Sequence, residues 1–99
     1  MGASISNAGE NKWTYLGKYT DTNYHDLPAD WNELYIMSMY SGSQAFPTVI
    51  VREYLESGGN GFFSQLDSSR QVYIYIDTAN NRIQLMNMNN TSWMKVYYR

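Results

Sequence analysis

The chain has no cysteine among its 99 residues, and only two prolines and one histidine. Without cysteine it cannot form disulfide bonds or thiolate metal sites. Its longest apolar runs are only a few residues, whereas a membrane-spanning helix needs roughly 20. Seven basic and nine acidic side chains give a net charge of −2 and form no basic stripe of the kind that binds nucleic acid. We therefore expect neither nucleic-acid binding nor membrane insertion.

The start of the chain carries neither the basic residues nor the apolar centre of a signal peptide. We expect residues 1–12 to form a flexible leader. Residues 13–99 are expected to form a single β domain, because a chain of this length holds one hydrophobic core. With no signal peptide, the protein is expected to be soluble.

Short runs with β-strand character are separated by connections rich in Ser, Asn and Gly. The runs span residues 13–19, 33–40, 46–52, 60–66, 72–77, 82–88 and 93–99. This spacing, with no long amphipathic helix, is typical of an all-β domain. We predict an antiparallel β-sandwich of jelly-roll-like form, or a small barrel, with about seven short strands.

Several runs alternate between an aliphatic row and a row of Tyr and Met. Val72, Ile74 and Ile76 form one such aliphatic row, and successive side chains of a strand point to opposite faces of its sheet. Three interpretations stay open: the core uses both rows, the second row is buried in a homo-oligomer, because interfaces are enriched in Tyr and Met, or the second row is a platform for a glycan. The predicted self-association surface comprises Tyr35, Met37, Met39, Tyr73, Tyr75, Met86 and Met88.

Aromatic side chains near the ends of the predicted strands are candidates for sugar binding, because a ring can cover the apolar face of a pyranose. Asn and Ser in the connections could bond sugar hydroxyls. The candidate glycan contacts are Tyr24, Trp31, Tyr40 and Trp93.

Residues suited to catalysis are few. His25 lies between Asp21 and Asp26, and a histidine beside carboxylates can act as a general base. Glu53 and Glu56 could pair for glycoside hydrolysis. No serine stands in a Gly-x-Ser-x-Gly elbow. We predict no catalytic residues, no metal and no cofactor, and hence that the chain is not an enzyme.

Three aromatic β segments resemble the small C-terminal domains of tail or fibre proteins from phages and prophages of Gram-positive gut bacteria. They are Trp13-Thr-Tyr-Leu-Gly17, Leu27-Pro28 with Trp31-Asn-Glu-Leu-Tyr-Ile36, and Met94-Lys-Val-Tyr-Tyr-Arg99. The resemblance extends over most of residues 13–99. It implies a β-rich, trimeric appendage of a virion or prophage particle, which contacts the bacterial surface and has no enzymatic activity.

We therefore expect a non-catalytic, phage-like structural or tail-appendage module that self-associates and contacts the host surface. Its expected partners are further copies of itself, with a trimer favoured by the resemblance, and a bacterial surface polysaccharide. One alternative is a monomeric carbohydrate-binding module. A second is a small glycan or peptide hydrolase.

Overall fold

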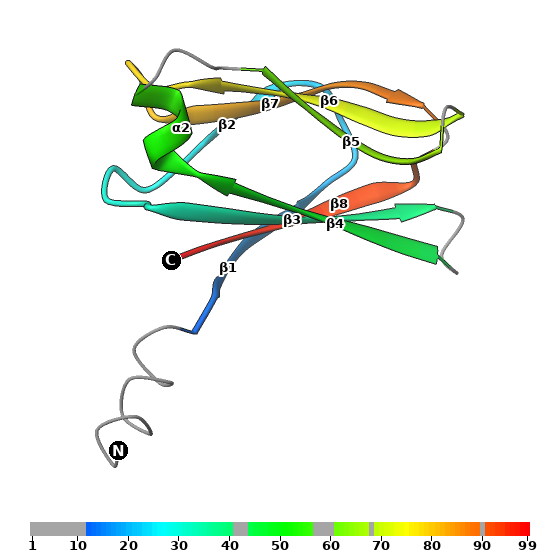
Figure 1. Cartoon of the computed structure of the whole chain (residues 1–99), viewed down its shortest axis with the longest axis horizontal. Helices are drawn as coiled ribbons and strands as arrows, with labels where there is room; N and C mark the ends of the chain where they lie inside the picture. Colours follow the sequence, from blue (N-terminus) through cyan, green and yellow to red (C-terminus); the bar gives the residue numbers. More distant parts are fainter. Residues whose placement is uncertain (1–11, 41–43, 57–60, 68, 90) are drawn as a thin grey trace.

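Two four-stranded antiparallel sheets face each other in the computed structural model, which describes residues 12–40, 44–56, 61–67, 69–89 and 91–99 (Figure 1). Sheet A has the order β1 (Thr14–Tyr19), β8 (Trp93–Tyr98), β3 (Glu33–Tyr40) and β4 (Gln44–Val51). Sheet B has the order β2 (Tyr24–Asp26), β7 (Arg82–Asn89), β6 (Arg70–Asp77) and β5 (Gly61–Asp67). Among the described residues no strand of one sheet pairs with a strand of the other. The predicted all-β sandwich is confirmed, and the barrel alternative is not.

The structure adds one strand to those predicted. β2 is three residues long and pairs with β7 through Arg82, Ile83 and Gln84. Tyr24–Asp26 was predicted to lie in a connection, because so short a segment shows no alternation of its own. Apart from Lys12, the predicted leader lies outside the described residues.

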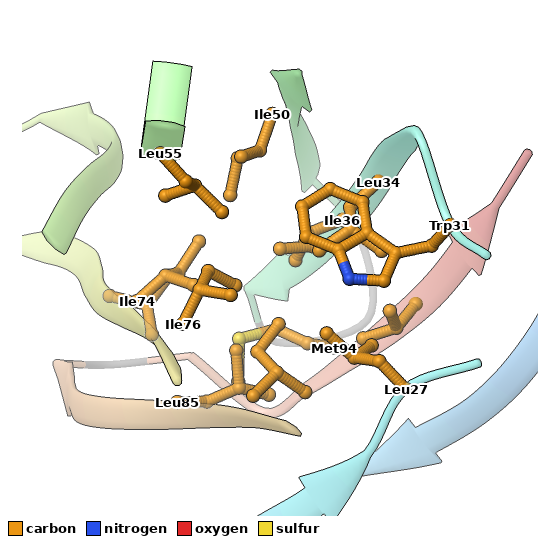
Figure 2. Close-up of a cluster of buried hydrophobic side chains, with 13 residues drawn as sticks. Leu27, Trp31, Leu34, Ile36, Ile50, Leu55, Ile74, Ile76, Leu85 and Met94 are labelled. Carbon is orange, nitrogen blue, oxygen red and sulfur yellow. The ribbon is translucent and has the colours of Figure 1, made fainter. Parts of the chain in front are cut away.

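The hydrophobic core lies between the sheets (Figure 2). Val72, Ile74 and Ile76 of β6 are fully buried, as the alternation predicted. Aliphatic side chains from the other strands meet them from both sheets. The cluster comprises Leu27, Trp31, Leu34, Ile36, Ile50, Leu55, Val72, Ile74, Ile76, Ile83, Leu85, Met94 and Val96.

One end of the sandwich is held by Arg52, the first residue of the short helix α2 (Arg52–Glu56). Its guanidinium donates to the carbonyl oxygens of Ala29 and Trp31, at 3.1 and 2.9 Å, and to Asn81 Oδ1 at 3.3 Å. Asn81 lies in the turn between β6 and β7 and has a positive φ of 49°, which asparagine tolerates. Arg52 therefore links the loop before β3 to a turn of sheet B.

All four edge strands carry features that discourage pairing with another chain. β1 has an irregular register between Tyr15 and Gly17, and β5 has one between Gln65 and Asp67. β2 has only three residues, and β4 contains Pro47, which has no backbone N–H to donate. Short strands, bulges and edge prolines all oppose edge-to-edge association. The faces of the sheets are therefore the surfaces better suited to contact another molecule.

Candidate functional site

The outer face of sheet A carries a cluster of aromatic side chains from three strands and the residue before β1. We call Trp13, Tyr15, Tyr35, Met37 and Tyr97 the aromatic face. Cross-strand register sets Tyr97 opposite both Tyr15 and Tyr35. Ring centroids lie 5.4 Å apart for Tyr15 and Tyr97, 5.8 Å for Tyr35 and Tyr97, and 5.5 Å for Trp13 and Tyr35. These spacings match favourable edge-on and tilted ring packing.

A hollow of about 90 Å³ opens in this face, lined by Trp13, Tyr35, Met37 and Tyr97. Beside it, Val49 of β4 pairs with Tyr35 and is 53% exposed. The face thus presents an apolar depression and, one strand away, an apolar projection. A hollow of this size could accept an aliphatic side chain.

Polar and ionic contacts support the aromatic face from its edge. Arg99 donates from Nε to Glu33 Oε1 at 2.6 Å, and its guanidinium lies 4.1 Å from the centroid of the Trp13 ring. The Glu33 and Arg99 pair therefore orients Trp13 through a cation–π contact.

On the outer face of sheet B, the tyrosine rings contact residues of the same sheet. The hydroxyl of Tyr73 lies where a Cβ on Gly61 would be, so the Tyr73 ring covers the glycine in the adjacent edge strand. Arg82 donates to Asp77 Oδ2 at 2.9 Å, and its guanidinium lies 4.0 Å from the ring centroid of Tyr24. These contacts occupy part of the polar and aromatic surface of this face.

The predicted self-association residues therefore separate into three places. Tyr35, Met37 and Met39 lie on the outer face of sheet A, opposite in direction to the buried Leu34 and Ile36.

Tyr73, Tyr75 and Met86 lie on the outer face of sheet B. The prediction is wrong for Met88, which packs against the core. An irregular register between β6 and β7 at Gln71 and Tyr73 changes the direction of side chains near the end of β7.

The four candidate glycan contacts do not form one site. Trp31 is fully buried in the core (Figure 2), so the prediction that its ring meets a sugar is wrong. The loop before β3 turns this indole inward between the sheets. Tyr24 is exposed on sheet B, Tyr40 lies at the end of β3 beneath the guanidinium of Arg70, and Trp93 begins β8 in sheet A.

His25 contacts both a carboxylate and an aromatic ring. Its Nε2 lies 2.7 Å from Asp21 Oδ1, and its ring stacks on Tyr19 with centroids 3.8 Å apart. The backbone N–H of Asn23, followed by His25, lowers the pKa of Asp21, while burial is the main cause that raises the pKa of Tyr19. Because Tyr19 and His25 come from the edge strands β1 and β2, this stack closes one side of the sandwich.

An open hollow of about 420 Å³ lies at the end of the sandwich that Arg52 holds, lined by Asn32, Glu33, Val51, Arg52 and Glu53. Two of its charged groups are already engaged: Glu33 binds Arg99, and Arg52 binds backbone carbonyls. Glu56, the proposed partner of Glu53, has a side chain outside the described part of the structure. In the described ranges, no group of three or more His, Cys, Asp or Glu side chains could hold a metal ion, and no helix is long and apolar enough to cross a membrane.

Four contributors to the site were not predicted from the sequence: Trp13, Tyr15, Val49 and Tyr97. Alternation in residues 13–15 and 93–97 could have assigned these rings to one side of each strand. The pairing of β1 with β8, which brings the two strands together, has no local signal in the sequence.

Comparisons with protein-family models, curated proteins and solved structures found no match to this chain.

Proposed function

We propose that this protein is a non-catalytic structural module that self-associates through the aromatic face of sheet A. The observation that carries the proposal is the hollow lined by Trp13, Tyr35, Met37 and Tyr97, with the exposed Val49 beside it. Contiguous exposed apolar surface of this kind is typical of interaction sites. Protected strand edges direct association to a face.

A second copy is the proposed occupant because the face carries both parts of a self-complementary contact. In a two-fold arrangement, Val49 of each copy would enter the hollow of the other, since an isologous interface repeats every contact twice. Tyr and Met are favoured in such interfaces. The outer face of sheet B is less suited to this role, because Arg82 and Tyr73 are engaged within that sheet.

The number of copies depends on how many faces take part. One face meeting itself gives a dimer with two-fold symmetry. A trimer, which the resemblance of residues 13–99 to phage tail and fibre domains favours, needs two different surfaces on each copy. Either assembly suits an architectural piece of a virion or prophage particle that contacts a bacterial surface.

Sedimentation velocity of the full chain, over about a hundredfold range of concentration, tests the proposal. The unsubstituted protein should form an oligomer, and Val49→Lys should weaken association by about tenfold or more, because it places a charge in an apolar contact. Met86→Lys is the matched control, since it adds the same charge to an exposed position on sheet B.

A monomer at every concentration would contradict self-association. Equal weakening by Val49→Lys and Met86→Lys would contradict the choice of sheet A alone and would favour an assembly that uses both faces. Thermal melts of both variants at low concentration would confirm that each remains folded.

A further inference from the structure

Two lysines on the outer face of sheet A lie next to each other. Lys18 of β1 is directly opposite Lys95 of β8 in the antiparallel register. Their Nζ atoms lie 5.0 and 5.1 Å from the centroid of the same ring, that of Trp93. The side chains of Lys95 and Trp93 are half-buried, whereas Lys18 is exposed. Two positive charges therefore meet at one indole, beside the aromatic face.

The arginines are arranged differently. Arg70, Arg82 and Arg99 each pair with a carboxylate, and Arg52 donates to backbone carbonyls. None of the four ion pairs found among the described residues includes a lysine. Since the whole chain has a net charge of −2, the lysine pair is a local concentration of positive charge on an acidic protein.

Like charges directly opposite each other in neighbouring strands are unfavourable. The cation–π contacts with Trp93 offset this repulsion only in part, because such contacts near the protein surface stabilise a lysine modestly. An anion between the two ammonium groups would replace the repulsion by two charge-assisted hydrogen bonds. Residues that break a local rule of sheet design in this way often belong to functional sites.

We propose that Lys18, Trp93 and Lys95 bind an acidic sugar, one that carries a phosphate or a carboxylate. Lysine side chains are flexible, so both ammonium groups can turn from the indole to the anion. The Trp93 ring is then available to cover the apolar face of the pyranose. This binding site is separate from the proposed self-association. In it, the two lysines recognise the negative charge of the sugar.

NMR titration of the full chain with four probes tests the site: glucose 6-phosphate, glucuronate, glucose and inorganic phosphate. We expect the indole N–H of Trp93 and the amides of Lys18 and Lys95 to shift with one or both acidic sugars. Glucose alone and phosphate alone should bind at least about tenfold more weakly, because each supplies only part of the contact. The phosphate and carboxylate arms identify which acid the site prefers.

Lys18→Gln and Lys95→Gln should each weaken binding of the preferred acidic sugar by about tenfold. Lys12→Gln is the control, since it removes the same charge from an exposed position before β1. Repeating the titration on Val49→Lys keeps association from masking the site.

No shift with either acidic sugar, in both the unsubstituted chain and Val49→Lys, would overturn the proposal. Equal loss in Lys12→Gln would also overturn it, because binding would then reflect overall charge. Shifts with inorganic phosphate as large as those with the sugars would show an anion site without sugar recognition, contrary to the proposal.

Discussion

On the outer face of sheet B, aromatic rings are engaged with residues of the same sheet, whereas on sheet A four side chains surround an apolar hollow. Tyr73 covers Gly61, and Tyr24 lies beneath Arg82. On sheet A, Tyr35 and Tyr97 line the hollow and pack against other rings. Both faces have rows of Tyr and Met, so residue type alone does not distinguish a row used within the fold from one suited to another molecule.

The difference comes from what lies beside each row. Gly61 leaves room on the edge strand of sheet B that the Tyr73 ring fills. The Arg82 and Asp77 pair adds charge to that face beside the turn between β6 and β7. Beside Tyr35 and Met37, the edge strand of sheet A instead supplies Val49 and Pro47, which carry no charge. The row on sheet A is therefore apolar on its side towards β4, whereas on the other side Lys95 of β8 lies opposite Met37.

A substitution in the core that both sheets share should produce the largest effect and should disturb the two faces together. Trp31→Ala removes a fully buried indole, and we expect it to lower the free energy of unfolding by about 3–5 kcal/mol. Trp31→Phe should cost less, below about 2 kcal/mol, because it keeps a ring and removes an N–H with no hydrogen-bond partner in the described structure. Urea unfolding of both variants measures the difference. A near-neutral Trp31→Ala would contradict the position of this side chain in the core.

The second-largest loss of stability should be confined to sheet B. In Gly61→Ala, the new Cβ would collide with the Tyr73 hydroxyl, and the ring would have to move. We expect a loss of about 1–3 kcal/mol in unfolding free energy, with self-association unchanged.

The same substitution made in a Tyr73→Val background is the control, because the obstructing ring is then absent. Its cost should be clearly smaller there, as measured by a double-mutant cycle. Equal costs in both backgrounds would show that Tyr73 does not cover Gly61. A change in the sedimentation of Gly61→Ala would show that the outer face of sheet B also takes part in self-association.

Much of the fold was predictable from sequence because the inner rows are mainly aliphatic. Ile74 and Ile76 recur at every second residue, and this period specifies both the strand and its buried side. The three-residue β2 was not predictable, since its hydrogen bonds depend on β7, which follows some 60 residues later in the chain. The direction of Met88 was missed because an irregular register depends on the neighbouring strand.

The candidate site was less predictable than the fold. Tyr35 and Met37 were identified by alternation, but Trp13 and Tyr97 join them only through the pairing of distant strands. Trp31 was misplaced because a tryptophan in a loop can turn to either side, and no periodicity indicates which. Lys18 and Lys95 are 77 positions apart, and their register places them opposite each other only in the folded sheet.

The smallest effect that we predict is a loss of stability in acid, centred on sheet B. The pKa values of Asp21, Asp67 and Asp77, which lie in or beside strands of this sheet, are all lowered. For Asp77 the causes are hydrogen bonds from Asn80 and then from Arg82. A carboxyl whose pKa is lower in the folded than in the unfolded protein stabilises the fold above its unfolded pKa, about 3.9, and this contribution is lost as pH falls towards the folded value.

The melting temperature should therefore be lower at pH 2 than at pH 7, and Asp77→Asn should show a smaller difference between the two. The fall should be modest, because these carboxyls lie at the surface, where solvent screens their interactions. Thermal melts at low protein concentration measure it without a contribution from association. An unchanged melting temperature, or the same fall in Asp77→Asn, would contradict the stabilising role of this carboxylate.

Amide hydrogen exchange tests whether the loss of stability is on sheet B. As the pH is lowered, exchange should increase in β6 and β7 at a higher pH than in β3 and β8. Uniform exchange across both sheets would instead show that the two faces share a single response to acid.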